Sequence, residues 1–366
     1  MPKPKHSIDY IFFSITCVLV VIGLFAFFSA SLGVLSVNQP KFYSIIFSQL
    51  VLGLCAGLLA LYAGIRIPYK FWRKHAGMLM ILSVILTAMV FVPHVGSAHG
   101  GARRWISVFG FSFQPVEFLK IAFVMYLSAW LSWAKKRIDN KLFGLLPLLA
   151  LLGISAAVLC FQPDAKSLIL MTVTGFCMLF LYGTPLKYIL GLFFLSVGAF
   201  ILIAVSTPYL SQRISTYLHP GDDPNGSSYQ IQQSLIAVGS GQLSGKGFGQ
   251  SIQKFGYIPE PQGDSIFAII GEEFGFIGAS TVVILYLLFA MRGLWISRRA
   301  PDDYSGLLAS GLVIMLSAQS ILNIAAITGM FPLTGVPLVF MSQGGTSLMV
   351  SLGVVGIILG ISRQRK

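Results

Sequence analysis

Residues 10–32 read YIFFSITCVLVVIGLFAFFSASL, and this stretch decides the fold class. It holds no Asp, Glu, Lys or Arg, and it exceeds the roughly 20 apolar residues that cross a bilayer as a helix. Nine further stretches are also predominantly apolar over about this length, some with one or two charged residues, namely residues 43–64, 75–95, 113–133, 142–161, 165–183, 186–207, 265–291, 305–328 and 346–362. The sequence therefore predicts an all-α polytopic membrane protein with ten transmembrane helices, organised as one domain over residues 1–366.

Composition supports a membrane protein. Of the 366 residues, 55% are hydrophobic and 10% are charged, against about 25% charged in a soluble domain. The mean hydropathy is +0.82. A chain with so little charge cannot cover a soluble surface, which excludes a soluble enzyme, and a nucleic-acid partner is not expected despite the net charge of +13. The four cysteines lack metal-ligand spacing, and no metal site is assigned.

The basic residues predict the orientation. With the N-terminus inside, most of the 25 Lys and Arg residues fall in cytoplasmic segments, as the positive-inside rule requires. This predicts that both termini are cytoplasmic. The longest polar segment, residues 208–264, then forms a large extracytoplasmic loop between the seventh and eighth helices, where function often resides.

Ionisable residues at the outer membrane edge are the candidate functional residues, because charge is costly in lipid. Asp264 lies where the outer loop meets the eighth span, in PEPQGDSIF (residues 259–267). Helix capping is one explanation, but the same position suits a carboxylate that acts on a substrate in the outer leaflet. Asp164 permits the same two interpretations. Glu117 and Lys120 share a helix face, either as a self-neutralising ion pair or as the lining of a polar cavity.

Basic residues outside the membrane oppose the orientation rule. Arg103 and Arg104 precede Trp105 in GGARRWI (residues 100–106). Paired arginines suit a diphosphate through charge-assisted hydrogen bonds, although headgroup contact or loop anchoring explains them as well. The remaining candidate substrate-binding residues lie in the outer loop and in the Gly-rich start of the last helix, and they are Lys254, Glu260 and Ser342. Gln319 and Asn323 share a helix face and are expected to form interhelical hydrogen bonds.

Six blocks together resemble the SEDS family (shape, elongation, division and sporulation), the FtsW/RodA-type peptidoglycan polymerases, with the FtsW branch slightly favoured. The blocks are Gly101–Ile106, Gln114–Lys120, Gln162–Asp164, Tyr229–Ser234, Phe267–Gly275 and residues 328–347. The resemblance covers nearly the whole chain. The sequence departs from the family pattern at Gln262-Gly263 and Gln343, and Ala165-Lys166 replaces a small or apolar pair after Asp164.

The resemblance implies a peptidoglycan glycosyltransferase that polymerises lipid II at the outer face of the bacterial cytoplasmic membrane, in division or elongation. It places the catalytic aspartate at Asp264, and substrate-binding positions at Arg103, Arg104, Trp105, Glu117, Lys120 and Asp164. Expected partners are lipid II, polyprenyl diphosphate, membrane lipid and a class B penicillin-binding protein, which is a transpeptidase.

The residue types fit this chemistry. Asp264 would act as general base on the acceptor hydroxyl. Arg103 and Arg104, with Lys120 or a divalent cation such as Mg or Mn, would stabilise the diphosphate. The alternatives are a flippase for lipid-linked precursors, another lipid-sugar enzyme such as an O-antigen ligase, and an inactive scaffold. The flippase is disfavoured because the polar residues gather at the outer edge rather than at the midplane.

Overall fold

The computed structural model describes residues 7–92, 96–99, 102–108, 111–137, 145–219 and 228–365. Within them, nine helices are long and apolar enough to cross a membrane. They are α1 (Tyr10–Val37), the continuous run α2–η1–α3 (Gln39–Ser48, Gln49–Cys55 and Ala56–Arg66), α4 (Tyr69–Ala88), α5 (Val116–Arg137), α7 (Ala165–Tyr182), α8 (Leu186–Ser206), α11 (Ile266–Arg298), α12 (Asp303–Ile327) and α13 (Gly345–Ser362). The helical membrane fold is confirmed.

The tenth predicted span corresponds to α6 (Leu145–Phe161), a shorter apolar helix that packs against α7. Its 17 residues are at the lower limit of the length that crosses a bilayer, so the count of ten stays a prediction. A short 3₁₀ turn, η2 (Met89–Phe91), ends α4.

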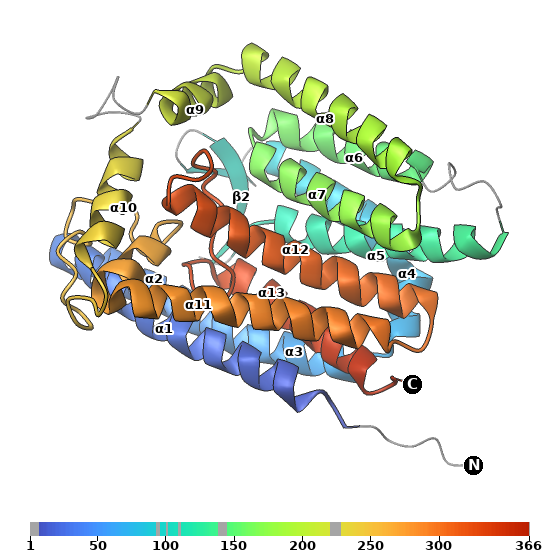
Figure 1. Ribbon diagram of the computed structural model, residues 1–366, viewed down its shortest axis with the longest axis horizontal. Helices are drawn as coiled ribbons and strands as arrows, with labels where there is room; N and C mark the ends of the chain where they lie inside the picture. Colours follow the sequence, from blue (N-terminus) through green and yellow to red (C-terminus); the bar gives the residue numbers. More distant parts are fainter. Residues whose placement is uncertain are drawn as a thin grey trace.

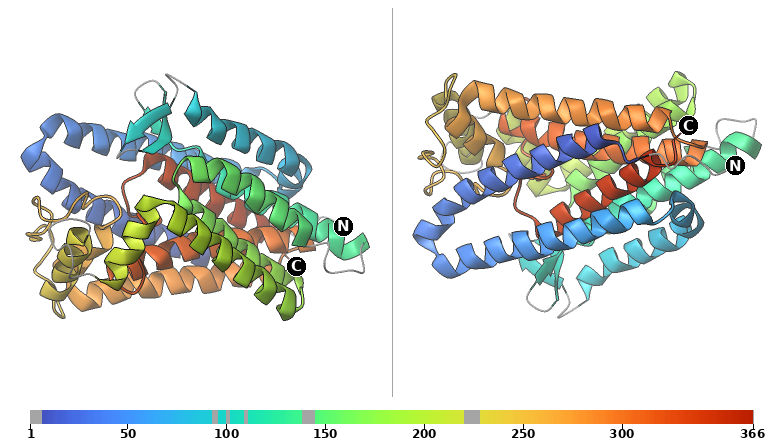
Figure 2. Two further views of the ribbon diagram at one scale, coloured as in Figure 1. Left: turned by 90° about the horizontal axis from the view of Figure 1, so that it is seen from above. Right: turned by 90° about the horizontal axis from the view of Figure 1, so that it is seen from below.

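Both termini lie at the same end of the bundle (Figures 1 and 2). The carboxylate of Asp9, which caps α1, pairs with Arg292 of α11 over 2.8 Å and with Arg365 over 3.1 Å. The backbone N–H of Asp9 donates to Ser362 at the end of α13. These contacts agree with the predicted placement of both termini on one side of the membrane.

Three short strands are a departure from the all-α prediction. β1 (Gly96–His99), β2 (Ala102–Val108) and β3 (Phe111–Phe113) form an antiparallel sheet in that order, before α5. The span predicted over 113–133 consequently starts three residues later, at Val116. Strand pairing satisfies backbone polar groups near the bilayer, where unpaired groups are costly.

The segment predicted as an outer loop, residues 208–264, contains helices in its described part. It holds α9 (Pro208–Leu218) and α10 (Tyr229–Ser240), which lie at the end of the bundle away from the termini (Figure 1). α10 packs along the start of α11. The segment therefore has fixed elements from which side chains can reach a site.

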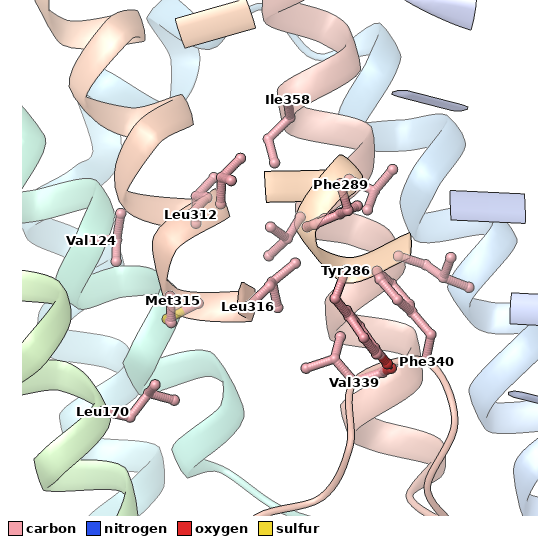
Figure 3. Packing of buried hydrophobic residues seen from close by; sticks show 14 of the residues in the cluster. Val124, Leu170, Tyr286, Phe289, Leu312, Met315, Leu316, Val339, Phe340 and Ile358 are labelled. Atoms are coloured by element: carbon pink, nitrogen blue, oxygen red, sulfur yellow. The ribbon is translucent and has the colours of Figure 1, made fainter. Parts of the chain in front are cut away.

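The centre of the bundle is formed by α12 and α13, the most deeply buried of the spanning helices. Phe289 of α11 stacks on Phe12 at 4.8 Å. Phe289 also contacts Phe340 edge-on (Figure 3). α13 approaches α3 closely through glycines, since a Cβ on Gly64 would lie 2.8 Å from the backbone of Gly356. Small residues allow such close helix packing in membranes.

Candidate active site

Asp264 directly precedes Ser265, the N-cap residue of α11, and its side chain does not cap that helix. Its Oδ1 accepts a hydrogen bond of 3.2 Å from Gln230 Nε2 of α10. Its main-chain carbonyl accepts one of 2.7 Å from Asn323 Nδ2 of α12. The capping explanation for Asp264 is therefore not observed, and the residue is held by α10 through its carboxylate and by α12 through its main chain.

Arg213 of α9 faces Asp264 across Gly335. A Cβ built on Gly335 would lie 3.6 Å from Asp264 Oδ2 and 3.7 Å from Arg213 Nη2. Gly335 has a φ of 65°, which favours glycine. Arg213 also donates to the carbonyl of Leu333. The sequence did not identify Arg213 as a site residue, because an arginine in an amphipathic outer helix carries no local signal.

The pKa of Asp264, which lies in the outer segment before α11, is raised above its usual value. Burial is the largest cause, and the negative charge of Glu260 adds to it. The positive charges of Lys166 and Arg213 oppose the shift. A carboxyl with a raised pKa is a stronger base once it is deprotonated, as general base catalysis requires.

Lys166, in the first turn of α7, also reaches Gly335, the residue beside Asp264 and Arg213. Its Nζ donates a hydrogen bond of 2.6 Å to the carbonyl of Gly335. Its charge interacts with those of Asp164, Asp264, Glu117 and Arg104. The sequence identified Lys166 only as a departure from the family pattern, yet the fold brings it to the centre of the site.

Arg103 and Arg104 have different surroundings. They are neighbours in β2 at a β-bulge, where Arg103 pairs with Ala98 and Trp105 with Ser97, so Arg104 is the extra residue without a strand partner. Arg104 turns towards the α6–α7 junction, where it donates to the carbonyls of Gln162 and Pro163. Arg103 is exposed and Trp105 is partly exposed. Arg104 therefore contacts the α6–α7 junction, and a joint role of both arginines in binding a diphosphate stays a prediction.

Asp164 adopts the capping role. Its carboxylate accepts hydrogen bonds from the backbone N–H and the Oγ of Ser167, at 3.4 and 2.9 Å, and it is buried. Since Arg104 holds the two residues before it, the turn that carries Asp164 and Lys166 is fixed to the sheet.

Glu117 and Lys120 form the predicted ion pair, with 2.9 Å between Lys120 Nζ and Glu117 Oε1. Lys120 also donates to Gln319 Oε1 over 2.9 Å, and Gln319 in turn donates to the carbonyl of Pro337. Asn323 donates to the carbonyl of Val336. The interhelical role predicted for Gln319 is confirmed, whereas Asn323 bonds to main-chain carbonyls outside the helices. Both residues fix residues 333–337 (the 333–337 segment) against the bundle.

The remaining predicted residues divide between structural and exposed positions. Lys254 Nζ is buried in an ion pair with Glu273 at 2.9 Å and also donates to Ser29, so the geometry assigns it a structural role in place of the predicted substrate contact. Ser342 is buried too, and its Oγ accepts from the backbone of Leu338. Glu260 is exposed, in a left-handed conformation with a φ of 47°, four residues before Asp264.

An apolar groove of about 610 Å³ leads to the site. Its walls come from α6, α7, α8 and α9, of which α6 to α8 lie side by side at one edge of the bundle (Figure 1). The only charged residues among those that line it are Arg104, Lys166 and Arg213. Such a groove suits a ligand with a long apolar chain and an anionic head.

The donor set does not fit a bound metal ion. In the part of the chain that the structure describes, no three His, Cys, Asp or Glu side chains converge to hold a metal. Asp164 is used by Ser167, and Glu117 by Lys120. We therefore derive no catalytic step from the divalent cation that the sequence allowed.

Comparisons with known proteins agree with the motifs. Residues 9–366 match the family model of the FtsW, RodA and SpoVE proteins, described as cell cycle protein. Stage V sporulation protein E of Bacillus subtilis is 38% identical over the full length of both chains. The probable peptidoglycan glycosyltransferase FtsW of Trichlorobacter lovleyi is 35% identical, over 100% of this chain and 96% of that one.

Solved structures share the fold. A chain of a peptidoglycan synthase complex, described as coordinating polymerization and crosslinking, is 25% identical, with a TM-score of 0.79 over 98% of both chains. The rod shape determining protein RodA of Thermus thermophilus is 24% identical, with a TM-score of 0.70 over 98% of this chain and 97% of that one. The motifs, the family model and the full-length relatives lead to one conclusion: this chain belongs to the FtsW, RodA and SpoVE family, the SEDS family of membrane proteins.

Proposed function

We propose that this chain is a peptidoglycan glycosyltransferase that polymerises lipid II into glycan strands, in division or elongation. Its membrane is the bacterial cytoplasmic membrane, and its site faces outward. The observation that carries the proposal is the position of the Asp264 carboxylate, which faces Arg213 across Gly335 where an apolar groove ends. The names of relatives that are 35% and 36% identical to this chain support the same activity.

The residues divide the reaction between them. The acceptor sugar hydroxyl attacks the anomeric carbon of the donor, and Asp264 takes the proton of that hydroxyl. The bond between the anomeric carbon and the diphosphate oxygen breaks, and the leaving diphosphate takes the electron pair. Positive charge near that oxygen stabilises the transition state. Arg104 and the apolar groove place the donor lipid, and Asp164 and the Glu117–Lys120 pair hold the surrounding turns.

A class B penicillin-binding protein is the proposed partner, as a transpeptidase that crosslinks the new strands. The structural likeness to a chain of a peptidoglycan synthase complex supports this assembly. Co-purification of the two proteins from the native membrane, with an increase in polymer length when both are present, is the expected result.

Polymerisation of purified lipid II by the detergent-solubilised protein tests the activity. Asp264→Ala is expected to lower the rate by about 10²- to 10⁴-fold, the usual contribution of a general base. Asp303→Ala, which removes a carboxylate at the other end of α12, is the control and should polymerise normally. Near wild-type polymer from Asp264→Ala would refute the assignment. Translocation of lipid II across vesicles without polymer, independent of Asp264, would instead establish the flippase.

A further inference from the structure

Lys166 occupies a position that connects two cavities. It lines the apolar groove together with Arg104 and Arg213. It also lines a small pocket together with Glu117 and Lys120, to which the 333–337 segment contributes Val336 and Pro337. An ammonium at this junction faces the apolar groove from one side and the carboxylates of the site from the other.

The hydrogen bonds of Lys166 leave capacity for a ligand. An ammonium carries three N–H donors. In the described part of the chain, the carbonyl of Gly335 is the one hydrogen-bond acceptor of Lys166, at 2.6 Å. Gly335 is also the residue over which Asp264 and Arg213 meet. The two remaining donors therefore lie beside the proposed base and beside a second cation.

The other cations of the site are already engaged by protein groups. Arg104 donates to the carbonyls of Gln162 and Pro163, and Arg213 to that of Leu333. Lys120 is shared between Glu117 and Gln319. Lys166 is the residue whose flexible stem and point charge can follow an anion from the groove towards Asp264.

We propose that Lys166 is a substrate-binding residue of this chain that holds the diphosphate of the polyprenyl donor, with Arg213 on the opposite side of Gly335. The groove accommodates the apolar chain, and the ammonium contacts the anionic head at the end of the groove nearest the base. The inference rests on the proposed function for its substrate class. It assigns a role to a lysine that stands where the family pattern has a small or apolar residue.

Direct binding measurements on the purified protein test this role separately from catalysis. The probes are a polyprenyl diphosphate and the uncharged polyprenol with the same chain. Lys166→Met is expected to weaken binding of the diphosphate by about 10- to 100-fold, as for a lost charge-assisted hydrogen bond. Binding of the polyprenol should remain unchanged. Lys187→Met removes an equal charge at the far end of α8 and should bind both probes as the wild type does.

Two further variants separate charge from structure. Lys166→Gln keeps an N–H donor for the Gly335 carbonyl but lacks the charge, so it should lose diphosphate binding as Lys166→Met does. Lys166→Arg keeps the charge and should retain most of the diphosphate binding. The proposal would be overturned if Lys166→Met lost affinity equally for the polyprenyl diphosphate and the polyprenol, or if Lys166→Gln bound the diphosphate fully. Should the wild type bind diphosphate through Lys166 and yet fail to polymerise lipid II, the proposed function would fail while this inference stood.

Discussion

Asn323 and Asp264 are joined through the main chain, because the Nδ2 of Asn323 donates to the carbonyl oxygen of Asp264 over 2.7 Å. The same amide nitrogen donates to the carbonyl of Val336, also over 2.7 Å. A buried side chain of α12 therefore holds the residue of the proposed base and the segment beneath it in one fixed relation. Neither contact reaches the substrate, so Asn323 is a positioning residue.

Asn323→Ala is expected to lower kcat without raising KM for lipid II. Two carbonyls lose their donor, and an unsatisfied buried group costs about 1–3 kcal/mol. If that cost appears as misplacement of Asp264, the rate falls by about 10- to 100-fold. Ser310→Ala is the control, since its Oγ bonds only within α12. Steady-state polymerisation kinetics measure both, and a rise in KM alone would contradict a positioning role.

The raised pKa of Asp264 predicts the acid side of the pH profile. The base acts when deprotonated, so activity should be lost as the pH falls, with a midpoint above the ordinary carboxyl value of 3.8. Glu260→Gln removes a negative charge that raises this pKa and should move the midpoint to lower pH. Lys166→Met removes a charge that lowers it and should move the midpoint to higher pH. Initial rates across the acid range provide the test, and shifts of both variants in one direction would exclude Asp264 as the titrating group.

Because the ion pair of Lys254 and Glu273 is buried, loss of Lys254 should destabilise the protein much more than loss of Lys246 does. The Lys254 side chain is 0% exposed, whereas that of Lys246, which pairs with Glu272, is 34% exposed. Lys254→Met leaves an uncompensated buried carboxylate and should destabilise the protein by about 3–5 kcal/mol. Lys246→Met should cost less, because Lys246 is partly exposed and the buried Glu272 carboxylate keeps hydrogen bonds from residues 251–253. Unfolding in detergent compares the two, and equal losses would contradict the assignment of Lys254 to the interior.

Much of the fold could be predicted from the sequence, because the bilayer imposes a long apolar helix at each crossing. Charge is costly inside the bilayer, so Glu117 and Lys120, which share a helix face, could also be predicted as an ion pair. Local rules also sufficed for Asp164, whose capping of α7 depends on residues three positions away.

The composition of the site could not be predicted from local pattern. Lys166 meets the carbonyl of Gly335 across 169 residues of chain, and Arg213 meets Asp264 across Gly335. Such juxtapositions depend on the packing of α7, α9 and α11, for which no periodicity in the sequence gives a signal. The surroundings of Arg103 and Arg104 depend on the β-bulge at this point of β2, for which the local sequence gives no signal either.

The cluster around Asp9 predicts how pH affects stability at the end of the bundle that holds both termini. Burial raises the pKa of this carboxyl, but hydrogen bonds from Arg292 and the Phe12 backbone, with the charges of Arg292 and Arg365, outweigh burial and hold the pKa below 3.8. The folded state therefore gains stability from ionised Asp9 at every pH above 3.8, and this gain is lost as the pH falls through the lower folded pKa.

Asp9→Asn should destabilise the protein by about 1–3 kcal/mol near neutral pH, as for lost hydrogen bonds to a charged group. Thermal unfolding in detergent should show the wild type and Asp9→Asn converging only below pH 3.8. Arg298→Gln, an exposed change at the same end, should differ from the wild type by less than about 1 kcal/mol at any pH. A gap between wild type and Asp9→Asn that already closes at pH 5 would show that Asp9 is not held by these arginines.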